Sequence, residues 1–185
     1  MAKVVTGEVR LSFPALFEPT TAPGSDTPKY SVMILVPKSD EKTVSALFAA
    51  EKAAAEAGKD SKFNGKVPKN LKSIIHDGDG ENDEGELIAE AYPERAGHYF
   101  MTVSANVQYK PQVVDRNLNA VIDPSQVYSG VYGRVSLNSF PYSASGNKGV
   151  SFGLNNVQIT RDGEPLSGRS TAEDDFEALE GSDLI

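Results

Sequence analysis

The residues with the clearest chemical pattern lie between Gln126 and Gly163. From Tyr128 onward the stretch alternates with a period of two, so one face of an expected strand is aliphatic. The opposite face carries three aromatic rings and one guanidinium, those of Tyr128, Tyr132, Arg134 and Phe140. A solvated sheet face normally shows mixed polar groups instead. Because rings stack on planar groups and cations pair with phosphates, the pattern predicts a binding surface.

A second run, Val150 to Thr160, follows a short glycine-containing loop at residues 146–149. The two runs together predict a long hairpin, with Tyr142 and Lys148 near its end. The apolar phase of the second run changes after Leu154, which predicts a β-bulge near Asn155 and Asn156.

Catalytic motifs find little support in the sequence. Residues 149–153 match the nucleophile-elbow string, which needs a helix directly after the serine and a histidine further along the chain. Here the residues after Ser151 are expected to form a strand, and both histidines, His76 and His98, precede it. Two lone histidines make no zinc set, and there is no Walker-type phosphate loop. Asp115 and Asp123 could hold magnesium as in nucleases, although carboxylates more often flank turns in this way. We therefore expect no catalytic residue, no metal site and no cofactor.

Charge is unevenly distributed along the chain. The net charge is -8, yet six acids and no base lie in residues 171–185, and seven acids and no base lie in residues 77–90. All 18 Lys and Arg lie elsewhere, against 13 acids. A mildly basic body with an acidic tail is typical of proteins that bind polyanions, although acidic runs also serve only to solvate a chain.

The segment from Lys59 to Lys72 is the most basic part of the chain. It holds five lysines around Phe63 and Pro68, and we expect a loop. This loop is either simply solvated or an arm that contacts phosphates. The phosphate-contacting candidates are Lys62, Lys66 and Lys69.

The acidic run from Asp77 to Glu90 invites comparison with a calcium loop. Asp77 and Asp79 fit the first and third positions, but Asn82 replaces the required glycine and Ile88 replaces the final glutamate. We therefore interpret the run as a mobile acidic loop without a metal.

The remaining pattern predicts a mainly β protein. Strands are expected at residues 4–13, 30–36 and 98–108, with Val5, Val9, Leu11 and Phe13 on the inner face of the first. Residues 14–28 read as a loop, and residues 113–122 as a small hairpin. A helix is expected from an N-cap at Ser39 to Gly58. Six or seven antiparallel strands with one inserted helix favour a small barrel of OB type.

Length and composition favour one domain in a reducing compartment. The chain of 185 residues has no cysteine, no apolar run near the ~20 residues of a membrane span, and no signal-peptide pattern at its start. We expect an OB-like domain at residues 1–170, a disordered acidic tail at residues 171–185, and a cytoplasmic protein without membrane contact.

Several short strings, in this order and spacing, resemble a phage-encoded family of single-stranded DNA-binding proteins. They are Arg10-Leu-Ser-Phe-Pro, Lys29-Tyr30, Val36-Pro37-Lys38, Tyr128-Ser-Gly-Val-Tyr132, Lys148-Gly-Val-Ser-Phe152 and Asp162-Gly-Glu. That family, formerly catalogued as a domain of unknown function, has an OB fold and is related to the replication binding proteins of short-tailed coliphages. The resemblance implies sequence-independent binding of single-stranded DNA in phage replication, recombination or repair, without catalysis, in the host cytoplasm.

The resemblance also implies an acidic C-terminus that competes with DNA and recruits phage or host replication proteins. The expected partner-binding residues of the tail are Asp174, Asp175, Phe176, Leu184 and Ile185. The chain ends in Leu-Ile where the common bacterial pattern has a terminal phenylalanine, and it lacks tryptophan, so stacking would rest on tyrosine and phenylalanine.

Two other classes of protein remain open from the sequence. A virion or scaffold protein would also be an all-β domain without chemistry, and a nuclease would need a carboxylate cluster that the sequence does not supply. The sequence leaves the choice of DNA or RNA and the oligomeric state open, including a homodimer.

Overall fold

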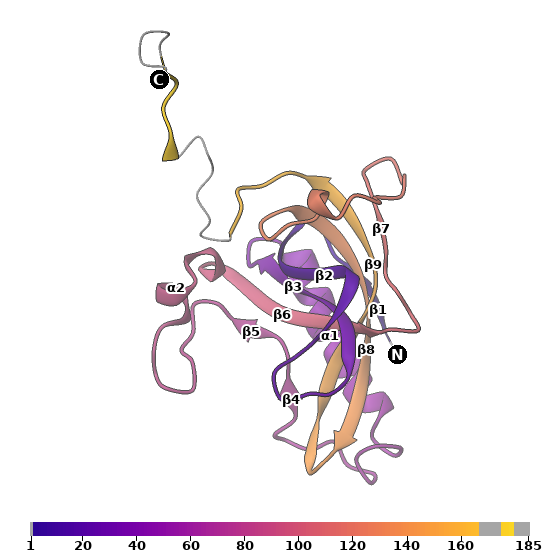
Figure 1. Cartoon of the computed structure of the whole chain (residues 1–185). Coiled ribbons are helices and arrows are strands. Elements are labelled where there is room, and N and C mark those ends of the chain that lie inside the picture. The colour runs from indigo at the N-terminus through magenta and orange to yellow at the C-terminus, as the bar shows by residue number, and fades with distance from the viewer. Residues whose placement is uncertain (1, 167–174, 180–185) are drawn as a thin grey trace.

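The computed structural model describes residues 2–166 and 175–179, and Figure 1 shows their arrangement. The strands of this described part are β1 (Lys3–Val5), β2 (Val9–Thr21), β3 (Pro28–Pro37), β4 (Lys72–Ser73), β5 (His76–Asp77), β6 (His98–Asn106), β7 (Gln112–Val114), β8 (Tyr132–Ala144) and β9 (Asn147–Arg161). The helices are α1 (Glu41–Ala57), α2 (Ile88–Ala91), and the 3-10 turns η1 (Pro93–Arg95) and η2 (Pro124–Gln126).

Five long strands form a closed circuit of pairings. The order is β2–β3–β6–β9–β8, and β8 returns to pair with β2 at Val9 and Arg10. The circuit closes through a parallel contact of β6 with β9 at Ser104 and Gly153. The expected OB-like, mainly β fold is confirmed. The expectation of a wholly antiparallel sheet was wrong, because β4, β6 and β7 each pair with β9 in parallel.

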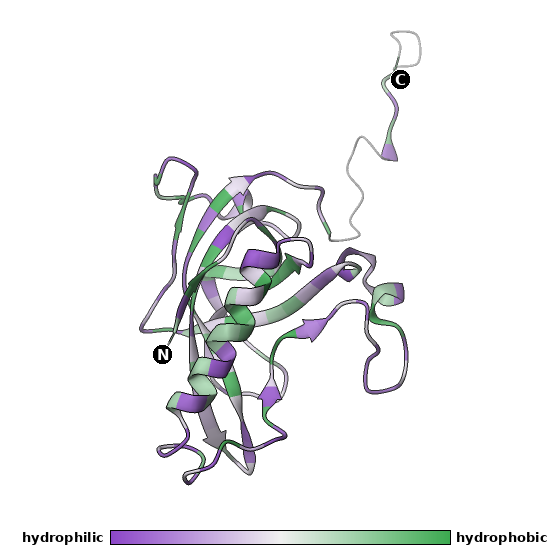
Figure 2. Ribbon diagram, turned by 180° about the vertical axis from the view of Figure 1, so that it is seen from behind, coloured by the Kyte–Doolittle hydropathy of each residue, from purple (hydrophilic) through white to green (hydrophobic). Residues whose placement is uncertain are grey.

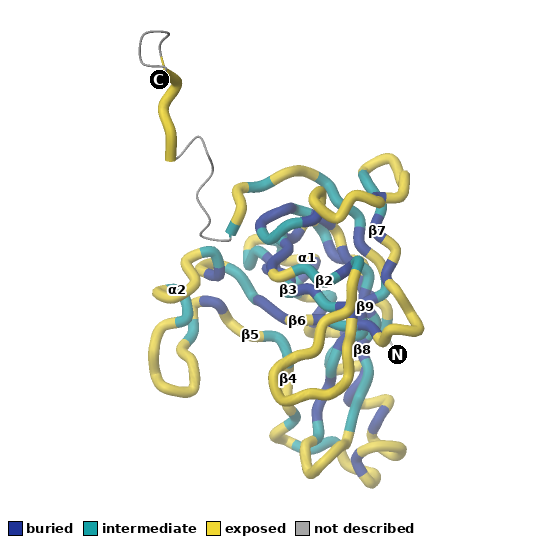
Figure 3. Tube along the Cα trace, viewed as in Figure 1, coloured by how far each residue is buried: buried dark blue, intermediate teal, exposed yellow. Residues whose placement is uncertain are grey.

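The core fills the inside of this circuit. Aliphatic side chains from the long strands are fully buried there, among them Val9, Leu11, Val32, Ile34, Val103, Val135 and Leu137. Burial alternates along most of β8, whereas Ile34, Leu35 and Val36 of β3 are all buried, so both faces of that strand are covered there. The buried interior of β3 and β6 is visible as dark blue tube in Figure 3.

The first predicted strand is interrupted, and two of its expected inner residues face outward. Val5 is 53% exposed and Phe13 is 62% exposed. The chain bends at residues 7–8 between β1 and β2, which resets the alternation. Phe13 has a positive φ of 48° where the register with β3 shifts, so its side chain turns away from the core.

The expected loop at residues 14–28 is largely strand. β2 continues to Thr21, and Thr20 and Thr21 pair with Lys29 and Pro28. The end of this hairpin is exposed and forms the long yellow segment in front of the sheet in Figure 3. Proline at residue 28 is tolerated because it lies at the end of its strand, where few ladder hydrogen bonds are needed.

Helix α1 covers one side of the sheet, as the view from behind shows (Figure 2). Its N-cap is Asp40 and not the predicted Ser39: the Asp40 Oδ1 atom accepts a hydrogen bond from the Thr43 amide at 3.1 Å. The C-cap is Gly58, as expected. Thr43, Leu47, Ala50, Ala54 and Ala55 are the buried positions of the helix.

The long hairpin predicted after Gln126 is confirmed as β8 and β9, with an extra residue at Asn155 that is the predicted bulge. Strand β8 begins at Tyr132, four residues later than the alternation indicated. The delay has a local cause, because Gly130 has a φ of +117° and packs against the backbone of Glu164, leaving no room for a side chain. The small hairpin predicted at residues 113–122 is also present, through a bridge between Val114 and Ala120.

The acidic run has more structure than a simple loop. It contains β5 and α2, and β5 pairs with β6. Lys38 at the end of β3 holds the start of the run through ion pairs of 2.6 Å to Asp77 and 2.7 Å to Asp79. Hydrogen bonds from Lys38 lower the pKa of both carboxyl groups, and the same bonds raise the pKa of Lys38.

The tail expectations fall mostly outside the described residues. Asp174, Leu184 and Ile185 are not described, whereas Asp175 and Phe176 are exposed, Phe176 at 74%. In residues 2–166 and 175–179 the structure contains no helix long and apolar enough to cross a membrane.

Burial predicts a strong contrast between two isoleucines. Replacing Ile34, which has no exposed surface, by alanine should lower the free energy of unfolding by about 2–5 kcal/mol, since it leaves a cavity in the closed sheet. Ile122→Ala is the matched control, because Ile122 is 87% exposed and should change stability by less than about 0.5 kcal/mol. Urea unfolding followed by circular dichroism measures both, and equal losses would contradict the described core.

The Lys38 ion pairs predict a pH dependence of the acidic run. Because the pKa values of Asp77 and Asp79 are lowered in the folded chain, the anchoring is complete above the ordinary carboxyl pKa near 4 and is lost as the pH falls through the folded values. Hydrogen exchange at the Gly97 amide, which donates to Asp79, should therefore quicken below about pH 4, after correction for intrinsic rates. Lys38→Gln should remove most of this pH dependence, and an unchanged profile would contradict the anchoring role.

Candidate nucleic-acid interface

The outward face of β8 carries two of the predicted rings close together. Phe140 and Tyr142 are two positions apart, and both are partly exposed. Pro141 between them faces α1, where its side chain abuts Gly58. Phe140 and Tyr142 therefore lie on the side of the ribbon that the helix leaves open.

Glycines of β9 lie beneath these rings. Gly149 is opposite Tyr142, and a Cβ atom there would lie 2.8 Å from the Tyr142 hydroxyl and 2.5 Å from the carbonyl oxygen of Lys72. At Gly153 a Cβ atom would meet the Phe140 ring at 3.9 Å, an ordinary contact. The rings can thus lie flat against the neighbouring strand, which gives an apolar surface suited to stacking.

A groove of about 310 Å³ opens beside Phe140, where β6 and β9 are joined only at Ser104 and Gly153. Lys29 at the start of β3, Tyr109 after β6, and the amide side chains of Asn106 and Asn155 line it. Tyr109 is 72% exposed. The groove thus combines two rings, a cation and amide groups that can hydrogen-bond to a ligand.

The sequence pattern did not identify this groove. Tyr109 lies just past the end of β6 and just outside the strand predicted at residues 98–108. The sequence feature that could have indicated the groove is the pair Tyr109-Lys110, an aromatic residue beside a lysine at the end of a strand. The pairing of β3 with β6, in which Lys29 lies opposite Asn106, brings Lys29 to this end of β6, and the closure of the sheet brings Phe140 beside it.

The predicted lysines lie beside the far end of the ribbon. Strand β4, which ends the basic loop, pairs with β9 at Gly149 and Val150, next to Lys148. The loop is anchored by Phe63, only 3% exposed, while Val67 and Leu71 pack against a small buried cluster of Ala54, Ala55 and Val150. The predicted cations of the loop, Lys62, Lys66 and Lys69, are exposed. The fold thus brings together the basic loop, Lys148 and Tyr142.

Tyr128 lies apart from this surface and is held in the fold. Its hydroxyl accepts a hydrogen bond from the Gly163 amide at 3.0 Å and lies 3.0 Å from both the Asp162 carboxylate and the Gly163 carbonyl oxygen. Its ring packs against the core, and burial raises the pKa of the phenol. This network ties the end of β9 to the segment before β8.

Tyr132 and Arg134 lie at the same end of the ribbon as Tyr128. The Tyr132 ring centroid is 3.7 Å from the Arg161 guanidinium and 5.4 Å from that of Arg10. Arg161 in turn pairs with Glu8 at 2.9 Å. Burial raises the pKa of Glu8, but hydrogen bonds from Thr160 and Arg161 outweigh it and leave the pKa below its ordinary value.

Arg134 donates from Nε to the carbonyl oxygen of Thr6 at 3.0 Å, and its side chain is exposed. The structure therefore separates the predicted residues into two groups. Phe140, Tyr142 and Lys148 lie toward the basic loop, whereas Tyr128, Tyr132 and Arg134 lie at the opposite end of the ribbon.

The carboxylates considered for magnesium stabilise turns. Asp115 accepts hydrogen bonds from the amides of Asn117 and Asn119, and Asp123 accepts from Ser125. These bonds lower the pKa of both carboxyl groups. Among residues 2–166 and 175–179, no three His, Asp or Glu side chains are grouped as a metal site would require.

Comparisons with known proteins identify the family of this chain. The model of the family described as "Enterobacter phage Enc34, ssDNA-binding protein" matches residues 2–184. The p50 protein of Acyrthosiphon pisum secondary endosymbiont phage 1 is 30% identical over 193 residues, covering 99% of this chain and 98% of p50.

Two solved structures share the fold. The single-stranded DNA-binding protein from bacteriophage Enc34, in complex with single-stranded DNA, aligns with a TM-score of 0.70 at 20% identity over 88% of each chain. The single-stranded DNA-binding protein gp2.5 of bacteriophage T7 aligns with a TM-score of 0.60 at 13% identity, over 100% of this chain and 98% of gp2.5. The match of the family model over nearly the whole sequence shows that the chain belongs to the Enc34 phage family of single-stranded DNA-binding proteins.

Proposed function

We propose that this protein binds single-stranded DNA without sequence preference and acts in phage DNA replication in the host cytoplasm, without catalysing a reaction. The observation that carries the proposal is the open face of the β8–β9 ribbon, where Phe140 and Tyr142 lie between the groove at Tyr109 and the basic loop. The family match and the Enc34 complex support it.

The proposed path of the DNA runs from the groove along the ribbon to the lysines. Bases stack on Tyr109, Phe140 and Tyr142, at about 1–3 kcal/mol per base, and every base has a face that can stack. Lys29, Lys148 and the exposed lysines of the basic loop contact phosphates. Arg134 and Tyr132 at the other end of the ribbon extend the surface if their present contacts rearrange.

The acidic C-terminal segment has a separate role in this proposal. Residues 171–185 compete with DNA for the cationic surface and recruit replication proteins, through Asp174, Asp175, Phe176, Leu184 and Ile185. Participation in recombination and repair belongs to the same proposal. Residues 1–170 then form the DNA-binding domain.

Fluorescence anisotropy with labelled oligo-dT and a matched duplex tests the function. The full chain should prefer the single strand, and a chain ending at Ser170 should bind more tightly because the competing carboxylates are gone. An absence of binding by both chains at low salt would overturn the proposal and favour a structural protein of the virion.

Ring removal tests the stacking surface. Tyr109→Ala and Phe140→Ala should each weaken oligo-dT binding by about 1–3 kcal/mol, roughly 5- to 150-fold, since each loses a stacked base. Phe48→Ala is the matched control, because Phe48 is 40% exposed and belongs to α1, the helix that covers the other side of the sheet. Similar losses in Phe48→Ala and Phe140→Ala would place the interface elsewhere.

Salt dependence tests the basic loop. The double variant Lys62→Gln with Lys66→Gln should lower the slope of log K against log salt by about 1.4, since each single-strand phosphate contact contributes about 0.7. Lys42→Glu, on α1, removes the same net charge of two and should leave the slope nearly unchanged. If both proteins lose the same slope, the basic loop acts only through net charge.

A further inference from the structure

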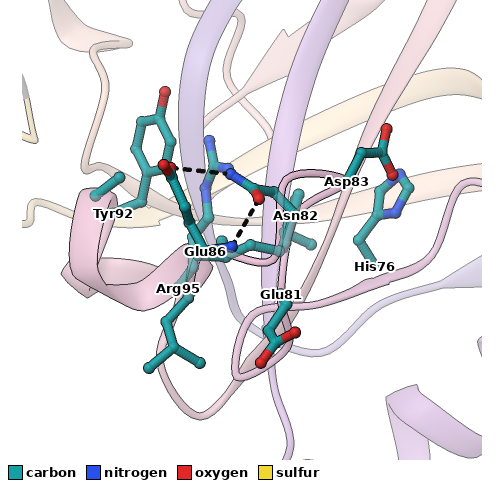
Figure 4. Close-up of a pocket in the computed structure, with 11 residues that line it drawn as sticks. His76, Glu81, Asn82, Asp83, Glu86, Tyr92 and Arg95 are labelled. Atoms are coloured by element: carbon teal, nitrogen blue, oxygen red, sulfur yellow. Dashed lines mark hydrogen bonds between the residues drawn. The ribbon is translucent and has the colours of Figure 1, made fainter.

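A second pocket lies at the start of β6, away from the groove at its end. It has a volume of about 310 Å³ and is lined by the acidic run and by η1 (Figure 4). Its apolar lining comes from Leu87, Ile88, Ala91, Tyr92 and Phe100. Leu87 and Tyr92 are 46% and 41% exposed, so the apolar surface continues out of the pocket.

Arg95 lines this pocket and lacks an acceptor. Its residue is only 8% exposed, and its guanidinium lies 3.7 Å from the Tyr92 ring centroid and 4.5 Å from that of Phe100. Within residues 2–166 and 175–179, no hydrogen bond or ion pair reaches the guanidinium, and its Nε atom is buried without a partner. A buried cation in this state is rare, because buried polar groups are normally satisfied.

Three carboxylates lie around the pocket, and none of them forms an ion pair with Arg95 in the described part of the chain. The side-chain amide of Asn82 donates a hydrogen bond to the Glu86 carboxylate, and the Asn82 Oδ1 atom accepts one from the backbone amide of Glu86. The side chains of Glu81 and Asp83 have no hydrogen-bond or ionic partner in the described part of the chain. The pocket thus offers guanidinium donors inside and unpaired carboxylates at its rim.

The guanidinium inside the pocket and the carboxylates at its rim determine which kind of ligand can bind there. Main-chain carbonyl oxygens are neutral acceptors that can satisfy Arg95 without facing repulsion from the three carboxylates. Lysine or arginine side chains can pair with Glu81 and Asp83, and an apolar side chain can cover Leu87 and Ile88. Phosphates are disfavoured, because the rim is negatively charged.

We propose that this pocket is a docking site for a basic segment of a partner protein, a short peptide stretch with lysine or arginine beside an apolar residue. The site is separate from the surface proposed for DNA, since the two lie at opposite ends of β6, at Phe100 and at Ser104–Asn106. It does not depend on DNA binding.

A displayed library of random 12-residue peptides, selected against the full chain saturated with oligo-dT, tests the proposal. Enriched peptides should carry lysine or arginine next to an apolar residue. One enriched peptide is then made synthetically and titrated by calorimetry. Addition of this peptide should also shift the Arg95 Nε–H resonance in a nitrogen–proton correlation spectrum.

The double variant Glu81→Gln with Asp83→Asn should weaken this peptide at least tenfold and change oligo-dT affinity no more than a charge-matched control does. Glu18→Gln with Asp26→Asn removes the same charge from the exposed β2–β3 hairpin and should leave peptide affinity unchanged. Arg95→Lys should also weaken the peptide, while its melting temperature reports any loss of fold.

Several results would overturn the proposal. They are enrichment of peptides without basic residues, equal binding by the rim variant and the native chain, and displacement of the peptide by oligo-dT. Self-association that the rim variant abolishes, in the absence of any peptide enrichment, would instead assign the pocket to a second copy of the chain.

Discussion

The parallel contact between β6 and β9 closes the sheet, and the rest of the structure depends on it. It is made at one register position, Ser104 with Gly153. Closure removes two sheet edges and encloses the aliphatic core. Because the contact is so short, the two strands separate beyond it and leave the groove at Lys29, Tyr109 and Phe140. The same interaction therefore stabilises the fold and creates the candidate interface.

The β8–β9 ribbon extends beyond this closed part, and small residues determine what its open face can do. Glycine at 149 lets the Tyr142 ring lie against the neighbouring strand, where a Cβ atom would lie 2.8 Å from its hydroxyl, whereas Gly153 would tolerate a Cβ atom beside Phe140. Helix α1 covers the opposite side through contacts such as Pro141 with Gly58. One side of the ribbon is thus used for packing and the other stays available.

Charge is separated in space as well as in sequence. The basic loop lies beside the end of the ribbon, because β4 pairs with β9. The acidic run lies at the start of β6, where Lys38 anchors it and β5 pairs with Phe100 and Tyr99. A polyanion is attracted to one region and repelled from the other, which leaves the pocket at Arg95 accessible to a ligand of different chemistry.

The sequence by itself determined the features that depend on local periodicity. These include the mainly β class, the helix ending at Gly58, the β8–β9 hairpin and the bulge at Asn155, since alternation and turn residues act over a few positions. Alternation failed at Val5, Phe13 and Tyr128, where a bend, a positive φ and a close backbone approach reset the phase. Only the tertiary structure decided which rings and cations are neighbours. Lys29 reaches Tyr109, and Lys72 reaches Gly149, through strand pairing between distant segments, which no local pattern encodes.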